Sequence, residues 1–173
     1  MLPGASLAGC CLLHAVGGTA LSVLSACTAE HVEPVVLEEM AAEGLVRYEP
    51  DPDYWLSAEG LPYGYDCQAP DLEVDVGELE LIARAAGATM RCDIMLHILV
   101  SDLAGRPALA RIAQRVARRT HGWVFVEFHT PPSVDLLEYL ANAGRCVRVD
   151  DAVYLDAEAM TAWIAHPEFH VVK

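Results

Sequence analysis

Positive charge is almost absent from the first half of this sequence. Residues 1–29 contain no Asp, Glu, Lys or Arg, and Arg47 is the single base among residues 1–80, which carry 15 acids. Nucleic-acid binding depends on Lys and Arg side chains that neutralise phosphates, and a negative field repels both phosphate backbones and anionic membrane surfaces. We therefore expect neither nucleic acid nor membrane among the partners of this protein.

The short motifs that mark common catalytic sites are also missing. The sequence has no Walker A loop, no G-x-G-x-x-G and no G-x-S-x-G, and its six cysteines form no CxxC pair. We expect a non-enzymatic protein with no cofactor and no metal. The scattered cysteines are typical of small buried hydrophobic residues in a reducing cytoplasm, so we expect a cytoplasmic location.

Three local patterns keep a catalytic or metal-binding alternative open. His166 and His170 in "HPEFH" have metal-ligand spacing, although Pro167 disfavours a regular helix that would hold both on one face. Cys10 and His14 would share one face of a strand, and His97 lies inside the apolar run "IMLHILV". Buried structural roles are the preferred interpretation, and a small Cys/His enzyme is the third functional hypothesis.

The uncharged N-terminus raises the question of a targeting segment. "LSAC" at residues 24–27 has the form of a lipoprotein cleavage site, which leaves a lipoprotein signal over residues 1–27 as an alternative. A secretory signal needs a positively charged start, and the first base is Arg47. We predict instead a buried strand over residues 6–16 and, after Thr19 as its N-cap, a helix over residues 20–28.

Length and composition predict a globular fold with a substantial core. The chain has 173 residues, of which 54% are hydrophobic and 21% charged. We expect an α+β or α/β fold, in which a mixed sheet is flanked by helices. Residues 1–71 would form an acidic N-terminal half and residues 72–173 an α/β C-terminal half, either as separate domains or packed as one, with a linker over residues 59–71.

Hydrophobic periodicity and capping residues give the elements of this fold. Helices are predicted over residues 33–44, 76–87, 105–122, 132–144 and 156–169, the last one capped by Asp156. Strands are predicted over residues 90–101 and 123–128, with a strand or hairpin over 145–155. If the strands within residues 90–128 are parallel, the helix between them makes a crossover.

Residues 30–60 have the outline of a winged helix-turn-helix. A helix ending at Gly44 is followed by "LVRY", an acidic turn and "YWLSA", which together predict a β-hairpin after a pair of helices. A DNA-binding wing would carry Arg and Lys, whereas this segment carries mainly acids. A degenerate winged helix, used in transcription-related dimerisation or ligand sensing, is therefore the alternative functional hypothesis.

Aromatic residues interleaved with acids favour a surface for a basic protein partner. Aromatic side chains provide apolar anchors at interfaces, and carboxylates accept hydrogen bonds from Arg and Lys. The alternative is that the aromatic residues only cover the core of a small hairpin. The predicted partner-binding residues are Glu38, Glu39, Glu43, Glu49, Asp51, Asp53, Tyr54, Trp55, Glu59, Tyr63, Tyr65 and Asp66.

One basic helix face could compete for these carboxylates. Arg111, Arg115, Arg118 and Arg119 lie on the polar side of the helix predicted over residues 105–122. A phosphate-binding role for such a row is one hypothesis. We favour a solvated face, or ion pairs with acids of the N-terminal half.

The C-terminal half resembles a family of small, uncharacterised actinobacterial and myxobacterial proteins that are found near polymorphic toxins. The resemblance rests on "ALARIAQRVARRTHGWVFVEF" and on the ending "AVYLDAEAMTAWIAHPEFHVVK", about half of the chain. It implies a cytosolic immunity protein that neutralises a toxin by binding it, and it implies no catalytic residue. Our leading hypothesis is that the acidic surface occludes the basic active-site cleft of a cognate toxin.

Overall fold

A computed structural model describes residues 18–172 of the chain, and these residues form five helices and eight strands. The elements in chain order are β1 (Thr19–Ser25), α1 (Ala29–Ala42), β2 (Val46–Arg47), β3 (Trp55–Leu56), β4 (Pro62–Gln68), α2 (Val76–Ala86), β5 (Cys92–Ile98), α3 (Arg106–Thr120), β6 (Trp123–Glu127), α4 (Val134–Ala143), β7 (Cys146–Val149), β8 (Ala152–Leu155) and α5 (Ala157–Ala165).

All eight strands belong to one sheet, in the order β2-β3-β4-β5-β1-β6-β8-β7. Every neighbouring pair is antiparallel, so the α+β class is confirmed, and the sheet is antiparallel rather than mixed. Strands β1 to β4 come from the predicted N-terminal half and β5 to β8 from the C-terminal half. Because β1 lies between β5 and β6, the two halves share a single sheet. β5 and β6 run in the same direction on either side of β1 and are joined by α3.

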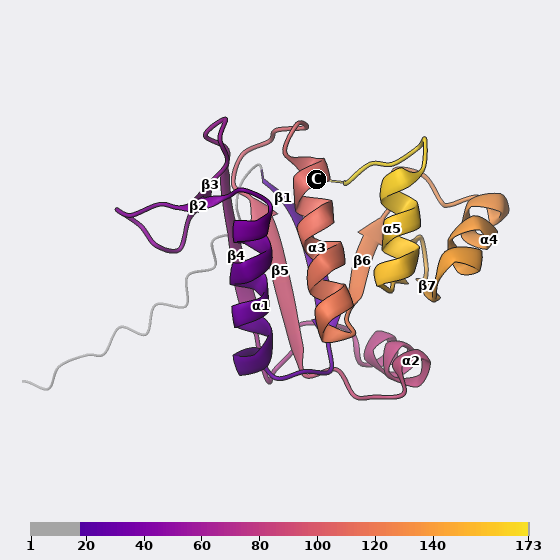
Figure 1. The fold of residues 1–173 in the computed structure, drawn as a ribbon. Coiled ribbons are helices and arrows are strands. Elements are labelled where there is room, and N and C mark those ends of the chain that lie inside the picture. The colour runs from indigo at the N-terminus through magenta and orange to yellow at the C-terminus, as the bar shows by residue number, and fades with distance from the viewer. Residues whose placement is uncertain (1–17, 173) are drawn as a thin grey trace, which may run out of the picture.

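The two faces of the sheet are covered unequally. Helices α1, α3 and α5 lie side by side on one face, with α4 packed beside α5 (Figure 1). Helix α2 lies apart from them, at the bottom of the view in Figure 1. The larger core lies under α1, α3 and α5 and includes Val36, Ile94 and Ile112. A smaller core joins α2 to the opposite face through Ile82, Trp123 and other apolar side chains. Residues of β2, β3 and β4 take no part in the smaller core.

The helix predicted over residues 20–28 is wrong, because Thr19–Ser25 form the central strand β1. β1 pairs with β5 along its whole length and with β6 at its C-terminal end. Leu21 and Val23 face the helices, and Leu24 packs in the smaller core on the other face. Tertiary pairing therefore overrides the local pattern, and the predicted pair of helices before the hairpin is a strand followed by one helix.

The linker predicted over residues 59–71 is also wrong, because Pro62–Gln68 form β4 inside the sheet. Pro62 is tolerated because it is the first residue of the strand. Gly64 is required by a neighbouring side chain, since a Cβ there would lie 2.6 Å from Nε2 of His97. Pro62 and Gly64 are thus strand residues rather than loop residues.

The remaining helices and strands agree with the sequence predictions, apart from small shifts of their ends. α1 begins at Ala29, earlier than predicted, so that Pro34 lies inside the helix. Residues 145–155 form the β7–β8 hairpin, and Asp156 caps α5 as predicted. The predicted strand over residues 6–16, the Cys10 and His14 pair and most of the possible lipoprotein signal lie outside the described residues. Across residues 18–172 we find no helix with the length and apolar character needed to cross a membrane.

Candidate partner-binding surface

The structure divides the predicted partner-binding residues into three groups. Glu38 and Glu39 lie on α1, Glu43 is its C-cap residue, and all three face α3. A second group, Trp55 and Tyr63, points into the main core. The third group lies on loops or on the exposed side of the sheet and consists of Glu49, Asp51, Asp53, Tyr54, Glu59 and Asp66, whereas Tyr65 is half-buried on the helix-covered face.

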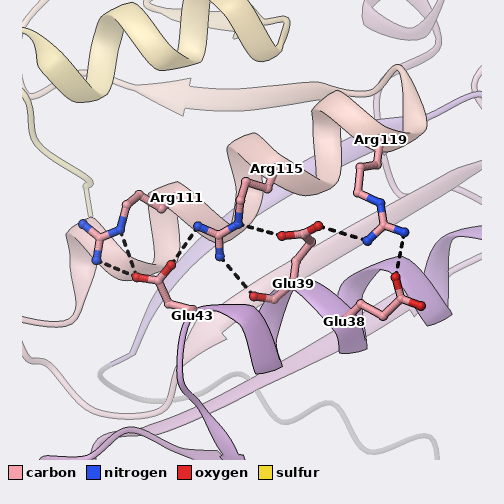
Figure 2. A network of polar contacts seen from close by, with 6 residues as sticks. All are labelled: Glu38, Glu39, Glu43, Arg111, Arg115 and Arg119. Atoms are coloured by element: carbon pink, nitrogen blue, oxygen red, sulfur yellow. Dashed lines mark hydrogen bonds and ion pairs between the residues drawn. The ribbon is translucent and has the colours of Figure 1, made fainter.

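The α1 carboxylates are held by arginines of α3 (Figure 2). Arg115 donates from Nε to Oε2 of Glu39 at 2.6 Å, and its Nη1 lies 2.8 Å from Oε2 of Glu43. Arg111 binds the other oxygen of Glu43 at 2.6 Å from Nη2. This ladder follows from the helical spacing, because positions 39 and 43, like 111 and 115, lie one turn apart.

Arg119 closes the ladder at its other end. Its Nη1 donates to Oε1 of Glu39 at 3.0 Å, and its Nη2 donates to Glu38 at 2.7 Å. Arg115 also donates to the backbone oxygen of Glu39 at 3.0 Å. The predicted internal pairing of the basic helix face is therefore confirmed for three arginines. The fourth, Arg118, faces Glu158 and Thr161 on α5.

Glu39 is a buried member of this network. The residue is 8% exposed. Burial acts to raise the pKa of its carboxyl, but hydrogen bonds from Arg119 and Arg115 outweigh burial, and the net pKa is lowered. Since Glu38, Glu39 and Glu43 are already bound by arginines, they have little capacity left for a partner, and we remove them from the predicted surface.

Trp55 and Tyr63 are core residues rather than exposed anchors. Trp55 is 8% exposed and Tyr63 is 1% exposed, and they are paired in register on β3 and β4. The hydroxyl of Tyr63 donates to the backbone oxygen of Gly105 at 3.1 Å, which ties the start of α3 to the sheet. For these two residues the alternative interpretation, that they cover the core of the hairpin, is the correct one.

The loop between β2 and β3, residues 48–54, carries the carboxylates that stay free for a partner; we call it the acidic loop. It contains Glu49, Asp51 and Asp53, and it projects from the edge of the sheet (Figure 1). Glu49 and Asp53 are exposed and Asp51 is partly exposed. Within residues 18–172, none of these three side chains takes part in an ion pair.

Backbone hydrogen bonds fold the acidic loop into two consecutive turns. Asp51 N–H donates to Tyr48 O at 3.1 Å, and Tyr54 N–H donates to Asp51 O at 3.1 Å. Tyr48 N–H bonds Tyr54 O at 2.8 Å and extends the β2–β3 ladder. A loop held in this way presents its carboxylates with a smaller entropy loss on binding than a free chain would.

Arg47 contacts both the acidic loop and the neighbouring strand β3. Its Nε donates to Pro52 O at 2.8 Å, and its guanidinium lies 5.9 Å from the ring centroid of Trp55. Both contacts hold the loop against the strands. Arg47, the only base of residues 1–80, therefore makes its contacts within the hairpin, and the tip of the acidic loop stays negative.

Two further acids extend the negative surface. Glu59 lies in the exposed β3–β4 turn, where its N–H donates to Ser57 Oγ at 3.2 Å. Asp66 lies on β4 with its side chain 74% exposed, and its Oδ2 is 3.7 Å from Nδ1 of His97. Tyr65, on the opposite face of β4, is half-buried against the main core.

The candidate catalytic and metal-binding histidines are engaged in structural contacts. Burial lowers the pKa of His97, with Asp66 acting in the opposite direction, so the ring is neutral at pH 7. Nε2 of His170 accepts a hydrogen bond from His129 N–H at 3.4 Å, and its Nδ1 lies 2.8 Å from Glu168 O. Residues 18–172 contain no cluster of three His, Cys, Asp or Glu arranged to hold a metal ion.

Sequence reasoning missed two exposed apolar side chains beside the acidic loop. Val46 and Tyr48 are 69% and 42% exposed. In the sequence, the alternation of Val46, Arg47 and Tyr48 indicates only that Val46 and Tyr48 share one face of the hairpin. The pairing of Arg47 with Trp55 in the structure shows that this is the outer face.

Comparison of the chain with protein-family models, curated proteins and solved structures gave no match.

Proposed function

We propose that this protein binds a basic partner protein through its acidic loop, and that the partner is a toxin whose active-site cleft the loop occludes. The observation that carries the proposal is the contrast between two sets of acids. Arginines of α3 hold Glu38, Glu39 and Glu43, whereas Glu49, Asp51 and Asp53 project on a tied loop and take part in no ion pair among residues 18–172.

The physical basis of such binding is electrostatic complementarity. A negative loop accelerates encounter with a positive cleft and disfavours partners of the same sign. Carboxylates placed in a cleft that binds an anionic substrate would occupy the positions of its phosphates, so the toxin of this proposal is a nuclease or another enzyme acting on an anionic substrate. The C-terminal resemblance to toxin-associated immunity proteins supports the same conclusion.

Charge-reversed variants test whether the attraction is local to the acidic loop. The test variant carries E49K, D51K and D53K. The control carries E127K, D135K and E138K, three exposed acids of β6 and α4 with the same total change of charge. The probe is a fluorescent oligolysine peptide titrated at low ionic strength.

We expect the loop variant to bind the peptide at least about tenfold more weakly than wild type, because each lost close charge pair weakens binding. The control variant should lose markedly less affinity. Equal losses in the two variants would mean that the peptide senses only the overall charge, and that result would overturn the proposed surface.

The immunity role is tested separately in cells. A toxin gene beside the gene for this protein is expressed alone, with wild type, or with the loop variant. We expect survival with wild type and death with the loop variant. Death in the presence of wild type, or a gene neighbourhood without a toxin that has a basic domain, would contradict the immunity role.

A further inference from the structure

Among residues 18–172, no helix packs on the sheet face opposite α1 and α3 over β2 to β4 and the part of β5 around Met95, and we call this region the open face. Alternation along the strands fixes which side chains lie there, since Trp55, Tyr63 and Ile98 are buried on the helix-covered face. Their neighbours along each strand point the other way. Helix α2 packs against the sheet through the smaller core, whose strand residues come from β1 and β6 to β8.

Apolar and aromatic side chains form a band across this open face. Val46 pairs with Leu56, and Leu56 with Pro62, which places three apolar side chains in one row. In the next row Tyr48 lies opposite Tyr54, as their backbone hydrogen bond shows. Val46, Tyr48 and, further along the face, Met95 are 69%, 42% and 38% exposed.

The centre of the open face is formed by Gly64 of β4 and His97 of β5. Gly64 is paired with His97, and the imidazole ring lies over the glycine because no Cβ stands in its way. Met95 lies opposite Asp66 on one side and opposite Ser22 on the other. The open face therefore combines apolar contact area with the exposed carboxylate of Asp66.

We propose that the open face of β2 to β5 is the docking surface for an apolar part of the same basic partner, while the acidic loop binds its cationic residues. This inference rests on the proposed function and adds the kind of partner segment that is recognised. The segment carries Lys or Arg next to leucine-like or aromatic side chains. We call Val46, Tyr48 and Met95 the apolar anchors of this surface.

Charge and position both support this occupant. The acidic loop lies between β2 and β3, so it borders the open face directly, and Asp66 lies within the face. A second copy of this chain would bring its own acidic loop and its own Asp66 to the same place, and like charges oppose that contact. Apolar anchors surrounded by carboxylates match a basic segment with apolar side chains.

Two lysine-rich peptides of equal length and equal charge test this inference. One peptide has leucine and the other has serine at the same positions between the lysines. We expect wild type to bind the leucine peptide about tenfold more tightly, because only that peptide buries apolar area on the open face. The test variant is Tyr48→Ser with Met95→Ser, which removes two exposed side chains and leaves the charge unchanged.

In the test variant we expect the preference for the leucine peptide to fall to about twofold or less. The control variant, Leu81→Ser with Tyr139→Ser, removes side chains that are 40% and 44% exposed on α2 and α4, and should keep the preference. An absent preference in wild type, or one retained in the test variant, would overturn this inference. A failure of this inference can be distinguished from a failure of the proposed function. If the proposed function is wrong, the variant with E49K, D51K and D53K binds both peptides as tightly as wild type does.

Discussion

Glu39 joins Arg115 and Arg119 of α3, and its side chain is only 11% exposed. We expect Glu39→Gln to lower the free energy of unfolding by about 1 to 3 kcal/mol, because it weakens hydrogen bonds between charged groups in a partly buried place. Glu38→Gln is the matched control. Its side chain is 63% exposed, so the loss should be less than about 1 kcal/mol. Urea denaturation measures both values, and equal losses would contradict this account of the network.

The stabilisation by Glu39 should depend on pH. Because the pKa of its carboxyl is lowered in the folded state, the stabilisation is present above the ordinary pKa of a glutamate and is lost as the pH falls through the folded-state value. We therefore expect the stability difference between wild type and Glu39→Gln to shrink in denaturation experiments below about pH 4. A difference that stays constant from pH 7 to that range would contradict the lowered pKa.

Asp93 should show the opposite dependence. It is 6% exposed, and burial raises the pKa of its carboxyl despite the hydrogen bond from Ser22. Its ionised form therefore opposes folding at neutral pH, and this cost disappears below its ordinary pKa. We expect Asp93→Asn to raise the free energy of unfolding at pH 7, with no gain in acid. The new amide would lie opposite Gln68, whose Oε1 has no donor within residues 18–172. A stability loss at pH 7 that persists in acid would contradict this assignment.

The sequence favoured two interpretations of the α3 arginines, a solvated helix face or ion pairs with N-terminal acids, and the structure shows ion pairs for Arg111, Arg115 and Arg119. The sequence could not separate bound from free carboxylates. Glu43 and Glu49 are alike in sequence, and only the packing of α1 against α3 distinguishes them. For the same reason the buried Trp55 and the exposed Tyr48 could not be told apart.

At the scale of elements, two helix N-caps allow a direct comparison. Asp156 caps α5 by accepting from Ala159 N–H at 3.0 Å, and it also accepts from Nε of Arg145 at 3.1 Å. Ser133 caps α4 through one hydrogen bond, from Leu136 N–H. We expect Ser133→Ala to cost about 1 kcal/mol and Asp156→Ala about 2 kcal/mol or more, because Asp156 is buried and has two partners. Thermal denaturation compares them, and an equal or larger loss for Ser133→Ala would contradict the expectation.

Helices were predicted better than strands because their signals are local. α3 could be recognised from its apolar spacing alone, and Asp156 from its position before a helical pattern. β1 and β4 were missed because their pairing partners lie far away in the sequence. Gly64 and Pro62 made β4 look like a loop, and the reason for the glycine is the ring of His97 on another strand.

For the whole molecule, both the sequence and the fold determine where the formal net charge of −14 lies on the surface. The sequence places the excess of acids in residues 1–80. The fold then uses arginines of α3 to bind the acids of α1 and directs the acidic loop away from them. The molecule thus has a negative edge at β2 and β3 beside an open, partly apolar sheet face.

The central claim is that this edge, and not the overall charge, is where a basic partner binds. Hydrogen exchange of the backbone amides, measured with and without the leucine-containing lysine peptide, tests it most directly. We expect protection from exchange to increase in residues 46–56 and in the neighbouring strands β4 and β5, with α2, α4 and α5 unchanged. Protection spread evenly over the surface, or centred on the helices, would contradict the claim.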